Sequence, residues 1–225
     1  YIHITYGWKA NFLFIFLLAI IVFILLYFSK TKVEIKSTKK KLSLLSILNI
    51  YINIITDKHF LCNISFFALL NCGEWCYLTL SPFYFENVLH LSPNIFGLYL
   101  SCSASFYITG AFLTPIILNW LGINKTLALG IAISLMGSSI LLCISFLAPS
   151  FPLIIVIAVG LYIFGAAVIW GPSNSRALQR FEDARGAASA VRIFLLTASC
   201  GLGGLAGSLL DASSLIPLAL FLLAT

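Results

Sequence analysis

Predominantly apolar stretches, each long enough to cross a bilayer, recur along this chain of 225 residues. A helix needs about 20 apolar residues to span the hydrocarbon core. Backbone polar groups in lipid must find partners within the protein, and no stretch alternates with the period of a barrel strand, so helices are predicted. The predicted spans are 11–28, 60–84, 95–118, 127–147, 153–170 and 188–210, and a seventh begins at Leu215.

The composition excludes a water-soluble globule. Of all residues 61% are hydrophobic and 9% charged, and the mean hydropathy is +1.07, which leaves too few charges to cover a surface. The net charge of +6 does not indicate nucleic-acid binding, because the basic residues lie between apolar stretches. The cysteines lie inside apolar stretches, without metal-ligand spacing. We therefore predict an all-α integral membrane protein that contacts membrane lipid and needs no metal or cofactor.

The Lys and Arg residues of the connections predict the orientation. Segment 29–58 holds seven lysines, 119–126 one lysine and 173–187 three arginines, whereas 86–94 and 148–152 hold neither. The first, third and fifth connections are therefore predicted to be cytoplasmic. For the basic segment, a solvated loop followed by a membrane-surface helix is favoured over recognition of a specific lipid.

Several motifs carry a resemblance to a known family. They are GWKA at 7–10, SPF at 81–83, LSPNIFGL at 91–98, GPSN at 171–174 and ARGAASA at 184–190. In this order they resemble the start of the sixth helix, the end of the seventh and start of the eighth, and the loop between helices ten and eleven. The family is that of major facilitator drug exporters of the bicyclomycin and chloramphenicol resistance type.

The resemblance implies a major facilitator-type helical bundle covering about helices six to twelve, the last one cut short. Residues 1–28 would be the sixth helix, 29–58 the central cytoplasmic loop and 59–225 the carboxyl-terminal bundle. A partial chain is expected, whose partner is the amino-terminal half of the transporter. The sequence departs from the family pattern at NWLGINK, 119–125, where one lysine remains of a basic signature, and at FLLT, 194–197, where a glutamine is usual.

The function that the resemblance implies is proton-coupled efflux of drugs or other small amphipathic molecules, across a bacterial inner membrane. The alternative is a non-transporting remnant or partner-binding membrane fragment of a split transporter. An enzyme is not indicated, because the sequence has no HExxH, no GxSxG and no phosphate-binding Gly-Lys-Ser/Thr motif.

Glu74 is the main candidate for binding substrate or exchanging protons. An ionisable side chain within a span is costly unless it faces a water-filled cavity or a partner. At about 100° per residue, polar side chains of the second span fall on one face with it, which predicts a cavity wall. These residues are Asn63, Asn71, Glu74, Tyr77 and Ser81. The alternative is that Glu74 lies near the outer end and reaches only interfacial water.

The arginines near the cytoplasmic side are candidates for a latch or an anchor. Three of them lie beside two acids in one connection: Arg176, Arg180, Arg185, Glu182 and Asp183. A latch between helices ten and eleven is possible there, but a solvated loop is favoured because surface ion pairs contribute little. Arg192, one turn into the sixth span, is predicted to anchor at lipid headgroups, and a cavity role stays open.

Small residues cluster at 201–208 in the sixth span. Glycines four residues apart, such as Gly203 and Gly207, allow two membrane helices to approach closely. Close helix packing is therefore predicted for this stretch.

Overall fold

The computed structural model describes residues 7–28, 43–147 and 151–225, except for the side chain of Trp8, and no strand occurs within these ranges. The chain divides into two units, residues 1–42 and 43–225, each considered by itself. The first unit contains α2 (Trp8–Phe28), whose side chains from Phe12 onward are apolar on every side. This pattern is typical of a membrane span.

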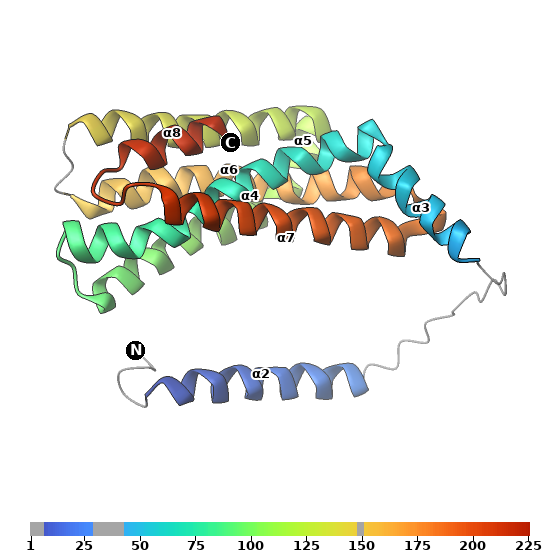
Figure 1. The fold of residues 1–225 in the computed structure, drawn as a ribbon, viewed down its shortest axis with the longest axis horizontal. Helices are drawn as coiled ribbons and strands as arrows, with labels where there is room; N and C mark the ends of the chain where they lie inside the picture. Colours follow the sequence, from blue (N-terminus) through green and yellow to red (C-terminus); the bar gives the residue numbers. More distant parts are fainter. Residues whose placement is uncertain (1–6, 29–42, 148–150) are drawn as a thin grey trace. The chain divides into compact units, whose positions relative to one another are not determined.

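The second unit is a bundle of helices. Figure 1 shows α4 to α8 running along a common direction, with α3 at one end of them. The elements are α3 (Leu44–Thr56), α4 (Lys58–Phe83), the π-helix η1 (Tyr84–Val88), α5 (Pro93–Phe146), α6 (Pro152–Gln179), the 3-10 helix η2 (Glu182–Ala184), α7 (Arg185–Leu209) and α8 (Ile216–Ala224).

Four helical segments of the described ranges are long and apolar enough to cross a membrane: Lys9–Phe28, Pro93–Phe146, Pro152–Gln179 and Glu182–Leu209. The 54-residue α5 is interrupted at Gly122 (φ 72°, ψ 169°), a conformation that glycine adopts without a Cβ penalty. It therefore supplies two of the predicted spans. The 26-residue α4 supplies another, although Glu74 and its asparagines lower its hydropathy. The prediction of an all-α membrane bundle is confirmed.

The helix α6 lies at the centre of the bundle, in contact with α4, α5 and α7. Tyr162 of α6 donates a hydrogen bond to the Leu70 carbonyl of α4 at 3.0 Å, and Ser134 of α5 donates to the Tyr162 carbonyl at 3.0 Å. Close approach to α5 depends on glycine, because a Cβ at Gly165 would overlap the Gly130 carbonyl oxygen and the Ser134 hydroxyl. These contacts hold α6 against α4 on one side and against α5 on the other.

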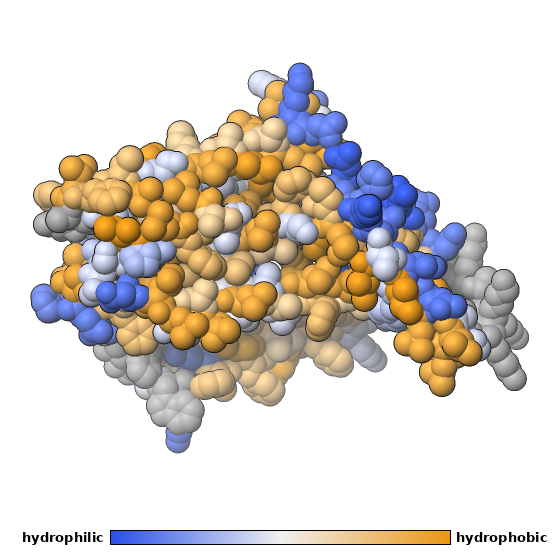
Figure 2. All heavy atoms as spheres, turned by 45° about the horizontal axis from the view of Figure 1, so that its top comes forward, coloured by the Kyte–Doolittle hydropathy of each residue, from blue (hydrophilic) through white to orange (hydrophobic). Residues whose placement is uncertain are grey.

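The basic connections lie at one end of the bundle. There the Arg180 Nε lies 2.9 Å from the Asp57 carboxylate, and the Arg176 Nη1 donates to the Asn124 Oδ1 at 2.7 Å. Figure 2 shows hydrophilic residues gathered toward this end, where α6 passes into α7, and a largely hydrophobic surface along the helices. Within the described residues, the connections that carry Lys and Arg therefore share one end, as the charge count predicts, whereas the lysines at 30–41 lie outside those residues.

The helix α3 has three faces. One face packs on α7, beside α4, through Ile50, Tyr51 and the fully buried Ile54. At about 100° per residue the next sector is apolar and exposed, and the last is polar. The exposed apolar residues are Leu44, Leu45, Leu48, Ile52 and Ile55, and the polar ones are Ser46, Asn49, Asn53 and Thr56. This pattern is that of a helix lying in a membrane surface.

We expect the exposed apolar face of α3 to lie in lipid. In vesicles, a membrane-impermeant maleimide should label Asn49→Cys several-fold faster than Leu48→Cys, measured above the background of the native cysteines. The two positions are neighbours in sequence and both exposed in the structure, so they are matched except for the face they occupy. Equal labelling rates would show that this face is in water.

Candidate functional site

A cavity of about 520 Å³ lies between α4, α5, α6 and α7. The helix α4 contributes Asn71 and Glu74, α5 contributes Tyr107, α6 contributes Trp170 and α7 contributes Arg192. The volume is in the range of sites that bind drug-sized molecules, about 300–1,000 Å³. The wall combines aromatic rings with a few polar groups, as such sites do.

Glu74 faces this cavity from the middle of α4, and its side chain is half-buried. Among the described residues Glu74 forms no hydrogen bond and no ion pair. A carboxyl at this depth in a spanning helix is costly unless water, a proton or a ligand satisfies it. Such a partner can reach Glu74 through the cavity that its side chain lines.

Asn71, one turn before Glu74, ties α4 to α7. Its Nδ2 donates to the Ser199 hydroxyl at 3.1 Å and to the Cys200 sulfur at 3.0 Å. The helices can approach this closely because Gly203 and Gly207 of α7 lie against the Cys72 and Cys76 backbone of α4. The prediction of close packing at these glycines is confirmed, and it positions Glu74 at the edge of the α4–α7 contact.

An aromatic cluster forms the other part of the wall. The rings of Phe67 and Trp170 have centroids 4.2 Å apart. The Arg192 guanidinium carbon lies 5.7 Å from the Trp170 ring centroid, a cation–π geometry. Arg192 is therefore placed on the cavity wall, with its charge against an aromatic face.

Three of the predicted polar residues of α4 do not line the cavity. Tyr77 and Ser81 are each 1% exposed and lie in the protein core, and Asn63 donates to the His59 carbonyl at 2.6 Å. Compared with the predicted polar stripe, the face of α4 that lines the cavity is shifted around the helix and includes Trp75 and Leu78. The structure thus brings Asn71 and Glu74 of that stripe together, buries Tyr77 and Ser81 in the core, and ties Asn63 to the backbone of its own helix.

The arginines of 173–187 contact three different elements. Arg180 pairs with Asp57 at the start of α4, and Arg176 bonds Asn124 beside the break in α5. Arg185 pairs with Glu182 of η2 at 3.1 Å, where both side chains are about two-thirds exposed (64% and 67%). The first two contacts connect the end of α6 to α4 and α5, and the third is local.

Tyr107, Trp75 and Trp170 line the cavity although the sequence did not single them out. Each lies in an apolar stretch, where an aromatic residue is as common in the core as in a site. No pattern along one helix predicts which aromatic residues of three helices meet. The one sequence feature that could have indicated an aromatic residue of the site is that Trp75 directly follows Glu74.

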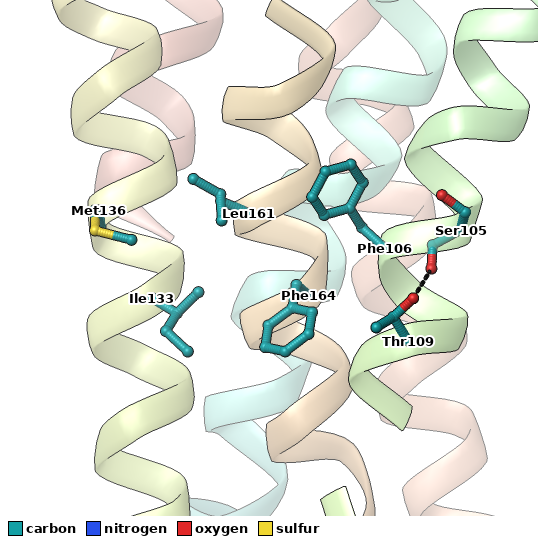
Figure 3. A pocket seen from close by; sticks show the side chains of 7 residues that line it. All are labelled: Ser105, Phe106, Thr109, Ile133, Met136, Leu161 and Phe164. Carbon is teal, nitrogen blue, oxygen red and sulfur yellow. Dashed lines mark hydrogen bonds between the residues drawn. The ribbon is translucent and has the colours of Figure 1, made fainter. Parts of the chain in front are cut away.

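A second cavity, of about 360 Å³, lies between the two halves of α5 and α6 (Figure 3). Its wall contains Phe106, Met136 and Phe164 and no charged residue. The two hydroxyls there are occupied: Ser105 donates to the Cys102 carbonyl at 2.6 Å, and Thr109 to the Ser105 carbonyl at 2.7 Å. It offers no free polar group, so the α4–α7 cavity is the candidate functional site.

The long apolar helices of the described ranges are those of a multi-pass membrane protein, and they enclose a cavity lined by an acid and an arginine. A sequence model of the Major Facilitator Superfamily matches residues 1–208. The chain belongs to the major facilitator superfamily, whose members are membrane transporters. No curated protein matches the chain.

Proposed function

We propose that this chain acts in the proton-coupled efflux of drugs or other small amphipathic molecules, as the carboxyl-terminal half of a major facilitator transporter in a bacterial inner membrane. In this fold two six-helix bundles enclose a site near the membrane midplane and rock against each other. Four helices of the described bundle line the cavity, which supports its role as one wall of that site. The amino-terminal half would be the partner that supplies the opposite wall.

The observation that carries the proposal is Glu74 on the cavity wall, without a partner among the described residues. A carboxyl in a spanning helix is neutralised either by a proton or by a cationic group of a bound molecule. Alternation between these two partners couples proton entry to release of substrate. The nearby Tyr107 and Trp75 supply aromatic surface for the apolar part of the substrate.

Glu74→Gln is expected to lower pH-driven efflux by about tenfold or more in cells that express the chain with its amino-terminal partner, because glutamine cannot exchange a proton. The measurement is efflux of a fluorescent cationic drug after an imposed pH gradient. Glu182→Gln is the matched control, since Glu182 is exposed on η2 and far along the chain from the cavity residues of α4. Unchanged efflux by Glu74→Gln at normal expression would remove Glu74 from the mechanism.

A further inference from the structure

Arg192 is an unsatisfied cation on the cavity wall. Its Nε is buried and has no hydrogen-bond partner, and the side chain forms no ion pair with any described residue. Its guanidinium carbon lies 5.7 Å from the centroid of the Trp170 ring. An anchor at lipid headgroups would carry its guanidinium out of the bundle, whereas this one lies against α6 inside it.

The contact with Trp170 leaves the guanidinium suited to an oxyanion. A cation–π contact satisfies the charge in part but supplies no hydrogen-bond acceptor, so the guanidinium N–H groups stay available. Those N–H groups match the two oxygens of a carboxylate in a bidentate pair. A buried N–H without an acceptor is costly, so a ligand that supplies the acceptor gains affinity.

Glu74 and Arg192 line the same cavity yet do not pair with each other. The two carry opposite charge and come from different helices, α4 and α7. Each therefore needs a partner from outside the described bundle. A single molecule with one cationic and one anionic group would satisfy both.

We propose that the cavity binds amphoteric aromatic molecules, with the carboxylate at Arg192 and the amine at Glu74. The aromatic body then lies along the rings of the wall, which include Tyr107 and Trp170. This inference rests on the proposed function and specifies its substrate class. It makes Arg192 a specificity-determining residue, because it distinguishes molecules that carry a carboxylate from simple cations.

The test compares three probes with the same aromatic body and different charge: naphthylalanine as the zwitterion, its methyl ester as the cation, and its N-acetyl form as the anion. Binding is measured by equilibrium dialysis with the purified chain in nanodiscs of neutral lipid. The wild-type chain should bind the zwitterion about tenfold or more tightly than either other probe, since hydrogen bonds to charged groups are the strong ones.

Arg192→Gln should weaken binding of the zwitterion and remove its preference over the ester. Arg192→Lys should keep part of the preference, because it retains the charge but loses the planar fork. Glu74→Gln should remove the preference for the zwitterion over the N-acetyl probe. Arg185→Gln, on the same helix but paired with Glu182, is the matched control and should bind all three probes like the wild-type chain.

The outcomes separate this inference from the proposed function. If the ester binds in a Glu74-dependent manner and the zwitterion gains nothing from Arg192, the inference is wrong and the proposed function stands. If no probe binds, or Glu74→Gln changes nothing in these binding measurements, the inference is wrong, and the proposed function is decided by the efflux of Glu74→Gln in the presence of the amino-terminal half. If anionic phosphatidylglycerol in the nanodiscs displaces the zwitterion only when Arg192 is present, a lipid headgroup is the anion at Arg192 and the inference is overturned.

Discussion

Gly203→Ala is expected to lower the free energy of unfolding by about 1–3 kcal/mol, the usual cost of overpacking, or by more. An added Cβ would meet the Cys72 carbonyl oxygen, which is backbone and cannot rotate away. The helices α4 and α7 would have to separate, which disrupts the hydrogen bonds from Asn71 to Ser199 and Cys200 and deforms the cavity wall. Unfolding in mixed detergent micelles, followed by circular dichroism, measures the loss.

Gly201→Ala is the matched control for that substitution. Gly201 lies on the same helix two residues earlier, and a Cβ there would meet nothing within 4 Å. Alanine favours a helix over glycine by up to about 1 kcal/mol, so this variant should be as stable as the wild-type chain or more stable. Gly207→Ala should behave like Gly203→Ala, because its Cβ would lie 2.6 Å from the Cys76 carbonyl oxygen. Equal stability of Gly201→Ala and Gly203→Ala would show that α4 and α7 do not pack this closely.

Asp57→Ala is expected to lower the free energy of unfolding by about 0.5–2 kcal/mol, mainly through loss of a helix cap. The Asp57 carboxylate accepts a hydrogen bond from the Phe60 amide at 2.7 Å at the start of α4 and also pairs with Arg180 at 2.9 Å. The Arg180 side chain is 55% exposed, so solvent screens the ion pair and the cap is the larger effect. Asp57→Asn keeps a good cap and loses the charge, so it should cost less than Asp57→Ala.

The pH dependence of stability at the junction between α3 and α4 follows from the Asp57 carboxyl. The hydrogen bond from the Phe60 amide, with help from Arg180, holds the pKa of Asp57 below its ordinary value. A depressed folded-state pKa gives stability that is fully present above the unfolded value of about 3.9 and is lost as the pH falls through the folded value. The stability difference between the wild-type chain and Asp57→Asn should therefore be constant near neutral pH and shrink below about pH 4. A difference that grows on acidification would contradict this assignment.

The positions of the membrane helices could be predicted from the sequence because hydropathy is a local property. Lipid leaves the backbone no partners but its own, so a long apolar stretch forms a helix whatever surrounds it. The break of α5 at Gly122 falls in the connection predicted at 119–126, because that connection is also recognised from local hydropathy. The small residues of α7 likewise predicted close packing, since glycine spacing is visible along one helix.

The candidate site could be predicted only in part, because helical periodicity shows which residues share a face and not what covers that face. On α4, Asn71 and Glu74 reach the cavity, whereas Tyr77 and Ser81 of the same predicted stripe are buried in the core. Arg180 lay beside two acids of its own connection, yet its partner is Asp57, which is distant in sequence. Such partners depend on how the helices pack.

The sequence by itself determined that this is an all-α membrane protein and located its spans, its basic connections and the acid within α4, because these follow from hydropathy and charge along the chain. The tertiary structure decided that α4, α5, α6 and α7 share one cavity and that Arg192 lies over Trp170 within it. The physical reason is that a cavity is made by side chains from several helices. Their meeting depends on crossing geometry and close contacts such as Gly203 on Cys72, which no single segment specifies.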